Sequence, residues 1–279
     1  MSDWLYPLPA LGRPGPDAPV LVCFPPAGGN PYFFGPLARV AADAARVQVA
    51  ALPGRPPRMA EPAGEDFWQL VSQLSEALAG LDSLDKALFF GHSMGAVLAY
   101  HCCVALQRQG KAPAGLVLSG AQAPTPFFAR MRQVACREPA QMIAELRRMG
   151  GVEPALLELP EFEELFLGAY RADCRAAAAY HETEVPLLDL PLLLLAGQDD
   201  ELAPPAALAG WRSVTRGPTR LLSLPGGHFY LNEQWPRIWD TLGATFPWLA
   251  QQAAPDPADR QGGSKQWNLK KWYWTATTP

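Results

Sequence analysis

The sequence has few of the residues that build disulfide frameworks or metal sites, and it lacks long apolar runs. Its 279 residues include five cysteines, none of them in a C-x-x-C pair, which favours reduced, buried thiols over disulfides or a metal centre. No apolar run approaches the roughly 18 residues that a membrane-spanning helix needs. The opening stretch MSDWLYPLPALGRPGP has no basic segment followed by an apolar one, so we predict no signal peptide. We therefore expect a cytoplasmic protein without membrane contact.

An excess of charge of one sign is also missing. Lys and Arg number 23 against 27 Asp and Glu, a formal net charge of -4, which gives no basis for binding nucleic acid or an anionic membrane. The chain is 49% hydrophobic and 18% charged, as in globular proteins. We expect a monomer that uses no cofactor.

Apolar segments alternate with helical patterns along most of the chain. Short apolar runs predict strands at 19–26, 47–52, 87–90, 115–118, 192–195 and 220–224. Apolar residues at helical spacing predict helices at 36–43, 65–81 and from 96 onward. This alternation is typical of an α/β fold with a mostly parallel sheet covered on both faces.

Two segments depart from the alternation. Residues 124–188 show only helical patterns, at 140–149, 160–170 and 171–180. We interpret them as a helical lid insertion above the carboxyl ends of the strands, with an insertion of no functional importance as the alternative. Residues 1–250 then form a single domain that ends near Leu249. Residues 251–279 contain a Gly-Gly-Ser break and three tryptophans among lysines, which predicts a flexible or loosely docked tail, or one that contacts a partner.

The segment Gly91-His92-Ser93-Met94-Gly95 stands between a predicted strand and a predicted helix. A G-x-S-x-G motif in that setting forms a nucleophile elbow, in which a sharp turn exposes the serine above the sheet. The glycines permit close packing of strand and helix around the turn. We predict that Ser93 is a nucleophile, and the alternative is an ordinary Gly-Ser turn before a helix.

A serine nucleophile needs a histidine base within hydrogen-bonding reach. The chain has four histidines. His92 is expected to point away from Ser93, His101 to be buried in the helix that follows, and His181 to lie at the end of the insertion. Only His228, in the PGGHFYL segment after the strand at 220–224, has the strand-end position of a general base.

The carboxylate that orients the base is expected after the strand at 192–195. Asp200 in the segment AGQDDE is the first candidate, Asp199 the second and Glu201 the third. The order Ser93…Asp200…His228 is that of the α/β-hydrolase fold.

Two backbone N–H groups should stabilise the oxyanion that forms during acyl transfer. One is that of Met94, directly after the nucleophile. The other is that of Ala27 in the Pro-Pro-Ala-Gly-Gly loop after the first long strand.

Several further segments are more specific than the serine motif: CFPPAGGN at 23–30, LPGR at 52–55, the pattern ELRRMGG…PE…RADCRAAAAY within 145–180, and PGGHFYL at 225–231. With GHSMGA at 91–96, they make the chain from about 20 to 249 resemble the type II thioesterases of polyketide and nonribosomal peptide synthesis. The resemblance implies an α/β-hydrolase fold with a helical lid and a triad of Ser93, Asp200 and His228. It also implies hydrolysis of acyl or aminoacyl groups from the phosphopantetheine arm of acyl- or peptidyl-carrier proteins, an editing role. The tail after Leu249 has no counterpart in the family pattern.

Two other functions remain open at this point. One is a free-standing serine esterase that acts on small esters, and the other is a non-catalytic scaffold with a hydrolase fold. Carrier proteins are generally acidic, so an arginine cluster in the insertion is a candidate docking face, with a merely solvated helix surface as the alternative. Its members are Arg130, Arg132, Arg137, Arg147 and Arg148.

Overall fold

The protein is built around one sheet of seven strands. The computed structural model describes residues 3–9, 12–15, 17–152, 154–157, 162, 166–180 and 185–250. The strand order is β1-β3-β2-β4-β5-β6-β7. The strands are β1 (Leu5–Pro7), β2 (Val20–Phe24), β3 (Arg46–Ala50), β4 (Ala87–His92), β5 (Gly115–Ser119), β6 (Leu192–Gly197) and β7 (Thr219–Leu224). β1 runs antiparallel to β3, and all other neighbours are parallel. The mostly parallel α/β architecture predicted from the sequence is confirmed.

The central strands are apolar because they are covered on both faces. Every residue of β2, β4, β5 and β6 is buried. Successive side chains point to opposite faces, so Val22 and Phe89 belong to one hydrophobic core while Leu21 and Phe90 belong to the other. The sheet thus separates two cores.

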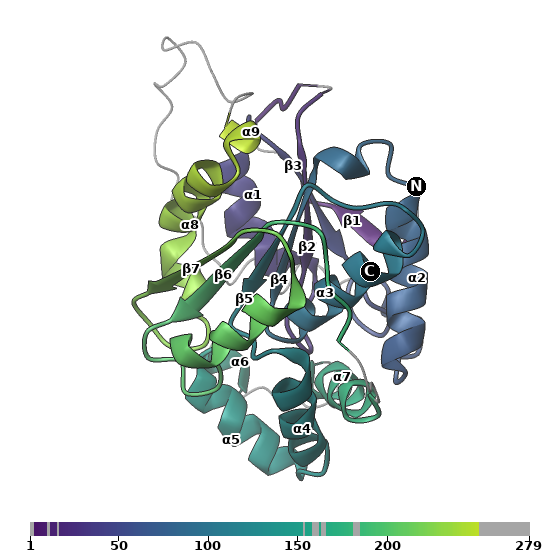
Figure 1. The fold of residues 1–279 in the computed structure, drawn as a ribbon. Helices are drawn as coiled ribbons and strands as arrows, with labels where there is room; N and C mark the ends of the chain where they lie inside the picture. The colour runs from purple at the N-terminus through teal and green to yellow at the C-terminus, as the bar shows by residue number, and fades with distance from the viewer. Residues whose placement is uncertain are drawn as a thin grey trace.

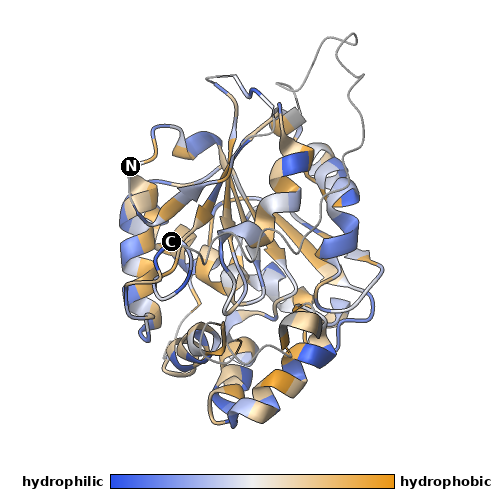
Figure 2. Ribbon diagram, turned by 180° about the vertical axis from the view of Figure 1, so that it is seen from behind, coloured by the Kyte–Doolittle hydropathy of each residue, from blue (hydrophilic) through white to orange (hydrophobic). Residues whose placement is uncertain are grey.

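Helices cover both faces of this sheet (Figure 1). On one face lie α2 (Phe67–Ala79) and α3 (Met94–Gln107), and on the other lie α1 (Gly35–Ala41), α8 (Leu231–Thr245) and α9 (Pro247–Ala250). Short 3-10 helices are η1 (Pro31–Phe34), η2 (Leu84–Lys86) and η4 (Pro205–Val214). Figure 2 shows mostly hydrophobic strands between helices in which hydrophobic and hydrophilic residues alternate.

The helix predicted at 65–81 corresponds to α2. Its side chains at helical spacing, including Leu70 and Leu74, are buried. The Asp66 side chain accepts a hydrogen bond from Gln69 N at 3.0 Å and so caps the first turn. Sequence spacing and capping together account for this element.

The insertion between β5 and β6 is helical, as predicted. It contains α4 (Pro124–Ala135), α5 (Pro139–Met149), α6 (Pro154–Leu157) and α7 (Gly168–Ala178). These helices gather at the carboxyl ends of the parallel strands (Figure 1). Its described residues include no strand, and Leu188 makes only an isolated bridge to Thr215.

Two details of the insertion differ from the sequence predictions. The predicted boundary between a helix at 160–170 and another at 171–180 is wrong, because α7 continues from Gly168 through that point to Ala178. Its sequence GAYRADCRAAA has no residue after the first that would interrupt a helix. The second difference is α4, a helix that the sequence patterns do not predict. Its Pro124 stands in the first turn, where a proline is tolerated.

The predicted end of the domain at Leu249 falls within α9, and the predicted tail at 251–279 lies outside the described residues. In the part of the chain that the structure describes, no helix combines the length and apolarity needed to cross a bilayer.

Candidate active site

The turn between β4 and α3 carries Ser93 in a strained conformation. Its φ and ψ are 55° and -122°, and it is the one non-glycine residue with positive φ among those described. A Cβ on Gly91 would lie 2.3 Å from Gly95 O, and one on Gly95 would lie 2.1 Å from Phe24 O. Both glycines are therefore required for helix and strands to pack this closely. Ser93 N also donates to Ser119 O at 2.8 Å, which ties the turn to the end of β5.

His228 lies in the loop after β7 and contacts the serine. Its Nε2 is 3.1 Å from Ser93 Oγ, and its Nδ1 is 2.9 Å from Asp200 Oδ2. His228 is 6% exposed and Asp200 2% exposed. A chain of hydrogen bonds thus runs from the buried carboxylate through the imidazole to the hydroxyl, as in serine hydrolases.

The Asp200 carboxylate is held by its own turn. Its Oδ1 accepts from Leu202 N at 2.8 Å and from Ala203 N at 3.0 Å. Burial by itself would raise the pKa of Asp200, but the hydrogen bond and charge of His228 and these two N–H groups lower it below its usual value. The carboxylate is therefore ionised beside the imidazole of His228.

The loops that carry Asp200 and His228 pack directly on each other. A Cβ on Gly197 would lie 2.3 Å from Gly227 O and 2.5 Å from Gly226 O. Gly197 ends β6, so its missing side chain brings the carboxylate loop within reach of the histidine loop.

The two predicted oxyanion donors follow neighbouring strands, β4 and β2. Met94 begins α3, where the N–H has no partner in the helix. Ala27 follows β2, and the end of β2 lies beside β4 because Phe24 pairs with Gly91. Among the described residues, neither N–H has a recorded acceptor.

The space at the serine is small. A cavity of about 10 Å³ is lined by Ser93, Gly120, Ala121, Gln122, Phe127, Arg130, Leu202, Ala203 and His228. This volume holds about one water molecule. This space does not hold an acyl chain unless lining side chains move, and Phe127 and Arg130 of α4 are two of them.

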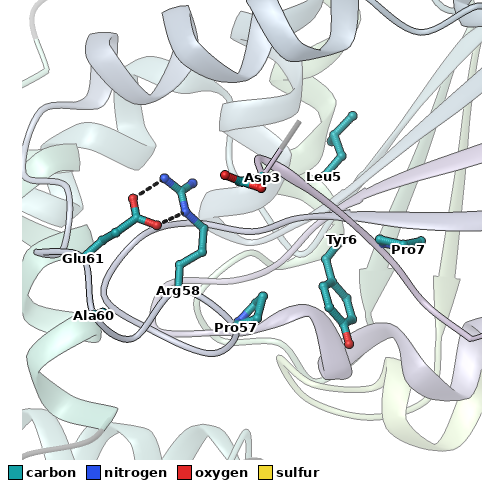
Figure 3. A pocket seen from close by; sticks show the side chains of 8 residues that line it. All are labelled: Asp3, Leu5, Tyr6, Pro7, Pro57, Arg58, Ala60 and Glu61. Atoms are coloured by element: carbon teal, nitrogen blue, oxygen red, sulfur yellow. Dashed lines mark hydrogen bonds and ion pairs between the residues drawn. The ribbon is translucent and has the colours of Figure 1, made fainter. Parts of the chain in front are cut away.

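A larger cavity, of about 440 Å³, lies away from Ser93 (Figure 3). It is lined by Asp3, Leu5, Tyr6, Pro7, Pro57, Arg58, Ala60 and Glu61. The guanidinium of Arg58 pairs with Glu61, donates to Ala51 O at 2.9 Å and lies 4.1 Å from the centre of the Trp4 ring. The lining has no serine, cysteine or histidine, so this cavity holds no serine–histidine pair like that of Ser93 and His228.

Comparison with known proteins gives the family. Residues 19–246 match the thioesterase domain family. The chain belongs to this family. It is a thioester hydrolase.

The sequences of individual relatives align with this chain over most of their length. The thioesterase is 35% identical over 264 residues to thioesterase PikA5 of Streptomyces venezuelae, covering 91% of this chain and 92% of the relative. It is 31% identical over 223 residues to a probable anguibactin biosynthesis thioesterase of Vibrio anguillarum, covering 78% and 88%.

Solved structures give the same result. BorB, a type II thioesterase from the borrelidin biosynthetic cluster, is 33% identical with a TM-score of 0.76, covering 88% of this chain and 98% of BorB. RedJ, a thioesterase from the prodiginine biosynthetic pathway of Streptomyces coelicolor, is 33% identical with a TM-score of 0.78, covering 86% and 95%. The α/β-hydrolase fold predicted from the sequence is therefore confirmed.

The structure separates the candidate carboxylates and histidines of the thioesterase. Asp199 is exposed, and Glu201 is exposed and pairs with Arg148 of α5. His92 is buried, with its Nδ1 3.0 Å from Ser119 Oγ and its ring centre 5.1 Å from that of His228. Burial and then the nearby His228 lower the pKa of His92 well below its usual range, so the ring is neutral.

The other two histidines are remote from this chemistry or not described. His101 packs among aromatic rings, and its Nε2 lies 3.2 Å from Tyr180 Oη. Burial, followed by the charge of Arg108, lowers its pKa to about 3. His181 lies outside the described residues.

Within the described ranges, no group of three or more His, Cys, Asp or Glu side chains could hold a metal ion. All five cysteines are free, and four are buried as predicted, but Cys136 at the end of α4 is exposed. The prediction of buried thiols is wrong at that position, because the chain leaves the core where the helix ends.

The arginines predicted to form one docking face divide into two groups. Arg130 of α4 and Arg137, which lies between α4 and α5, both form ion pairs with the buried carboxylate of Glu145 in α5. The Arg130 pair joins the two helices. Arg132, Arg147 and Arg148 are exposed.

One buried ion pair near the site was missed by the sequence analysis. Arg55 and Asp173 are 2% and 0% exposed, and they form two hydrogen bonds to each other. Both lie in motifs that carry the family resemblance, LPGR and RADCR. The presence of a charged residue in each motif could have suggested an ion pair. The sequence alone, however, does not show that two residues 118 positions apart are in contact.

Proposed function

We propose that the thioesterase releases acyl or aminoacyl groups from the phosphopantetheine arm of acyl- or peptidyl-carrier proteins in polyketide or nonribosomal peptide biosynthesis. The observation that carries the chemistry is the hydrogen-bond chain from Asp200 through His228 to Ser93. The names of its relatives, which place them in the borrelidin, prodiginine and anguibactin pathways, support the biosynthetic setting.

In the proposed reaction, Ser93 Oγ attacks the thioester carbonyl while His228 Nε2 accepts the hydroxyl proton. The tetrahedral oxyanion is stabilised by the N–H groups of Ala27 and Met94 and by the positive end of α3. Collapse breaks the C–S bond, and His228 returns the proton to the departing sulfur of the arm. Water, deprotonated by the same imidazole, then hydrolyses the acyl-serine and regenerates the enzyme.

Access through the helical insertion fits this substrate. The phosphopantetheine arm is long and thin, so it requires a narrow channel rather than an open groove. The small cavity at Ser93 and its wall of α4 side chains are consistent with a site that opens for such an arm. We propose that the insertion acts as the lid.

The test is hydrolysis of one panel of acyl groups presented in three forms: on a carrier protein, on coenzyme A and as simple oxygen esters. We expect the highest kcat/KM for the carrier-bound acyl groups. Equal turnover of the simple esters, with no advantage from the carrier, would instead identify a free-standing esterase. Absence of a Ser93 adduct with a fluorophosphonate, read by mass spectrometry, would identify a non-catalytic scaffold.

A further inference from the structure

A buried carboxylate on the helical insertion is bonded to the loop that carries a predicted oxyanion donor. The carboxylate of Asp173 in α7 accepts hydrogen bonds from Arg55 Nη1 at 2.5 Å and from Arg55 Nη2 at 2.7 Å. Its Oδ2 also accepts a hydrogen bond from Gly28 N at 2.7 Å. Asp173 therefore joins three segments: α7, the loop after β3 and the loop after β2.

The Gly28 contact fixes the backbone beside Ala27. Of the successive N–H groups at 27, 28 and 29, that of Gly28 donates to Asp173 and that of Gly29 donates to Pro26 O at 2.8 Å. The Ala27 N–H is left without a recorded acceptor among the described residues. The hydrogen-bonded amides of Gly28 and Gly29 follow Ala27, and Pro25 and Pro26 precede it. The peptide group of Ala27 therefore has little freedom to rotate.

The loop also packs closely on α7. Gly28 has a φ of 71°, and a Cβ there would lie 3.0 Å from Tyr170 Cβ. Close backbone approach and the ion pair together hold the loop against this helix. Arg55 is itself held in place, because its Nε donates to Pro53 O at 3.3 Å.

We infer that the Arg55–Asp173 pair is a positioning element for catalysis, which aims the Ala27 N–H at the oxyanion. The inference rests on the proposed function, since it concerns the same acyl transfer. Neither residue touches the reacting atoms. Asp173 acts through Gly28, and Arg55 acts by holding the Asp173 carboxylate in one orientation and compensating its buried charge.

α7 and α4 of the insertion contact different parts of the site. α7 is bonded to the oxyanion loop through buried charges, so moving it would also displace Gly28. Phe127 and Arg130 of α4, by comparison, are part of the lining of the cavity at Ser93.

The test uses Asp173→Asn and, as a second variant that keeps the positive charge, Arg55→Lys. Each is measured for kcat and KM on an acyl thioester. Each is also measured for binding of two inhibitors: a non-hydrolysable thioether and a trifluoromethyl ketone, which forms a tetrahedral adduct with Ser93. Circular dichroism and urea unfolding establish that the compared samples are folded.

We expect both variants to lose about 10- to 100-fold in kcat, since a complete oxyanion donor is worth ~10²–10³-fold. Affinity for the ketone should fall in parallel with kcat/KM, while KM and thioether affinity change little. Glu65→Gln is the matched control, because Glu65 pairs with Arg175 and so also ties α7 to the segment before α2, but at the exposed surface. It should leave every one of these quantities unchanged.

The inference is overturned if folded Asp173→Asn and Arg55→Lys keep wild-type kcat and ketone affinity. It is equally overturned if ketone and thioether affinities fall together, because that marks a general structural role. Failure of the proposed function is a separate result, in which the wild-type protein itself hydrolyses no acyl thioester. If Asp173→Asn does not fold, Arg55→Lys and its ratio of ketone to thioether affinity decide the question.

Discussion

Asp199 and Asp200 are adjacent in the sequence but have opposite surroundings. Asp200 is 2% exposed and lies 2.9 Å from His228 Nδ1, whereas Asp199 is exposed. The N–H groups of Leu202 and Ala203 turn the Asp200 carboxylate inward. The two aspartates therefore form a matched pair for mutagenesis.

Asp200→Asn is expected to lower kcat by about 10³–10⁴-fold, because the amide favours the wrong imidazole tautomer. Asp199→Asn should leave kcat nearly unchanged. Steady-state kinetics on one acyl thioester compares the two variants, with Asp199→Asn as the control for the loss of a negative charge. Equal losses, or the larger loss at Asp199, would reassign the orienting carboxylate.

Ser93→Ala is expected to lose about 10⁴-fold or more in kcat, since only binding and oxyanion stabilisation remain when a triad member is removed. The variant should also form no covalent adduct with a fluorophosphonate. Single-turnover hydrolysis and intact-protein mass spectrometry measure both effects. Retention of more than about a tenth of wild-type kcat would exclude the proposed mechanism.

Reversal of charge at two exposed arginines of α5 tests carrier docking. Arg147→Glu with Arg148→Glu is expected to raise KM for a carrier-bound acyl group and leave KM for a small acyl thioester nearly unchanged. The effect should weaken with added salt, because exposed charges are screened over about 8–10 Å near physiological ionic strength.

The matched control for this charge reversal is Arg108→Glu with Lys111→Glu. These exposed residues lie at or beyond the end of α3 opposite to Ser93, and the double variant changes net charge by the same amount. An equal rise in KM for both substrates would mean that the α5 arginines support the fold of the insertion. No change for either substrate would place docking on another surface.

Thiol titration tests the cysteine environments. Cys136 is exposed, whereas the other four cysteines are buried. Burial raises the pKa of Cys102 and of Cys174 to about 12, which suppresses their thiolates. We therefore expect one fast-reacting thiol with a disulfide reagent in the native protein and five after denaturation. Cys136→Ser should remove the fast phase, and rapid reaction of several thiols would contradict the buried environments.

Much of the fold follows from local sequence patterns. The buried strands β2, β4, β5 and β6 are continuous apolar runs, and the serine, aspartate and histidine each follow one strand of the parallel sheet. Because parallel strands end at one edge of the sheet, order in the sequence predicts proximity in space. The structure then brings Ser93, Asp200 and His228 together.

Elements with weak local signals were missed. β1 has only three residues, and its antiparallel pairing with β3 comes from a long-range contact rather than from its own sequence. α8 contains Pro236, which argues against a helix, although buried Trp235, Ile238 and Leu242 keep helical spacing and pack on the sheet. In α8, tertiary packing outweighs local propensity.

The ion pairs of the insertion could not be predicted for a related reason. Arg130 and Arg137 were interpreted with the exposed arginines because sequence spacing does not reveal that Glu145 is buried between them. Pairing of Arg55 with Asp173 depends on how α7 lies against two loops from distant parts of the chain. Such contacts are properties of the assembled core.

The backbone angle of Ser93 carries a consequence for the thermal behaviour of the protein. A non-glycine residue held in such a region costs about 1–3 kcal/mol, and glycine adopts it without that penalty. Ser93→Gly is therefore expected to melt at a higher temperature than both the wild type and Ser93→Ala, by scanning calorimetry, while lacking all turnover. An equal or lower melting temperature would show that the elbow is relaxed. The turn at Ser93 thus lowers the thermal stability of the fold by the conformation that presents the hydroxyl.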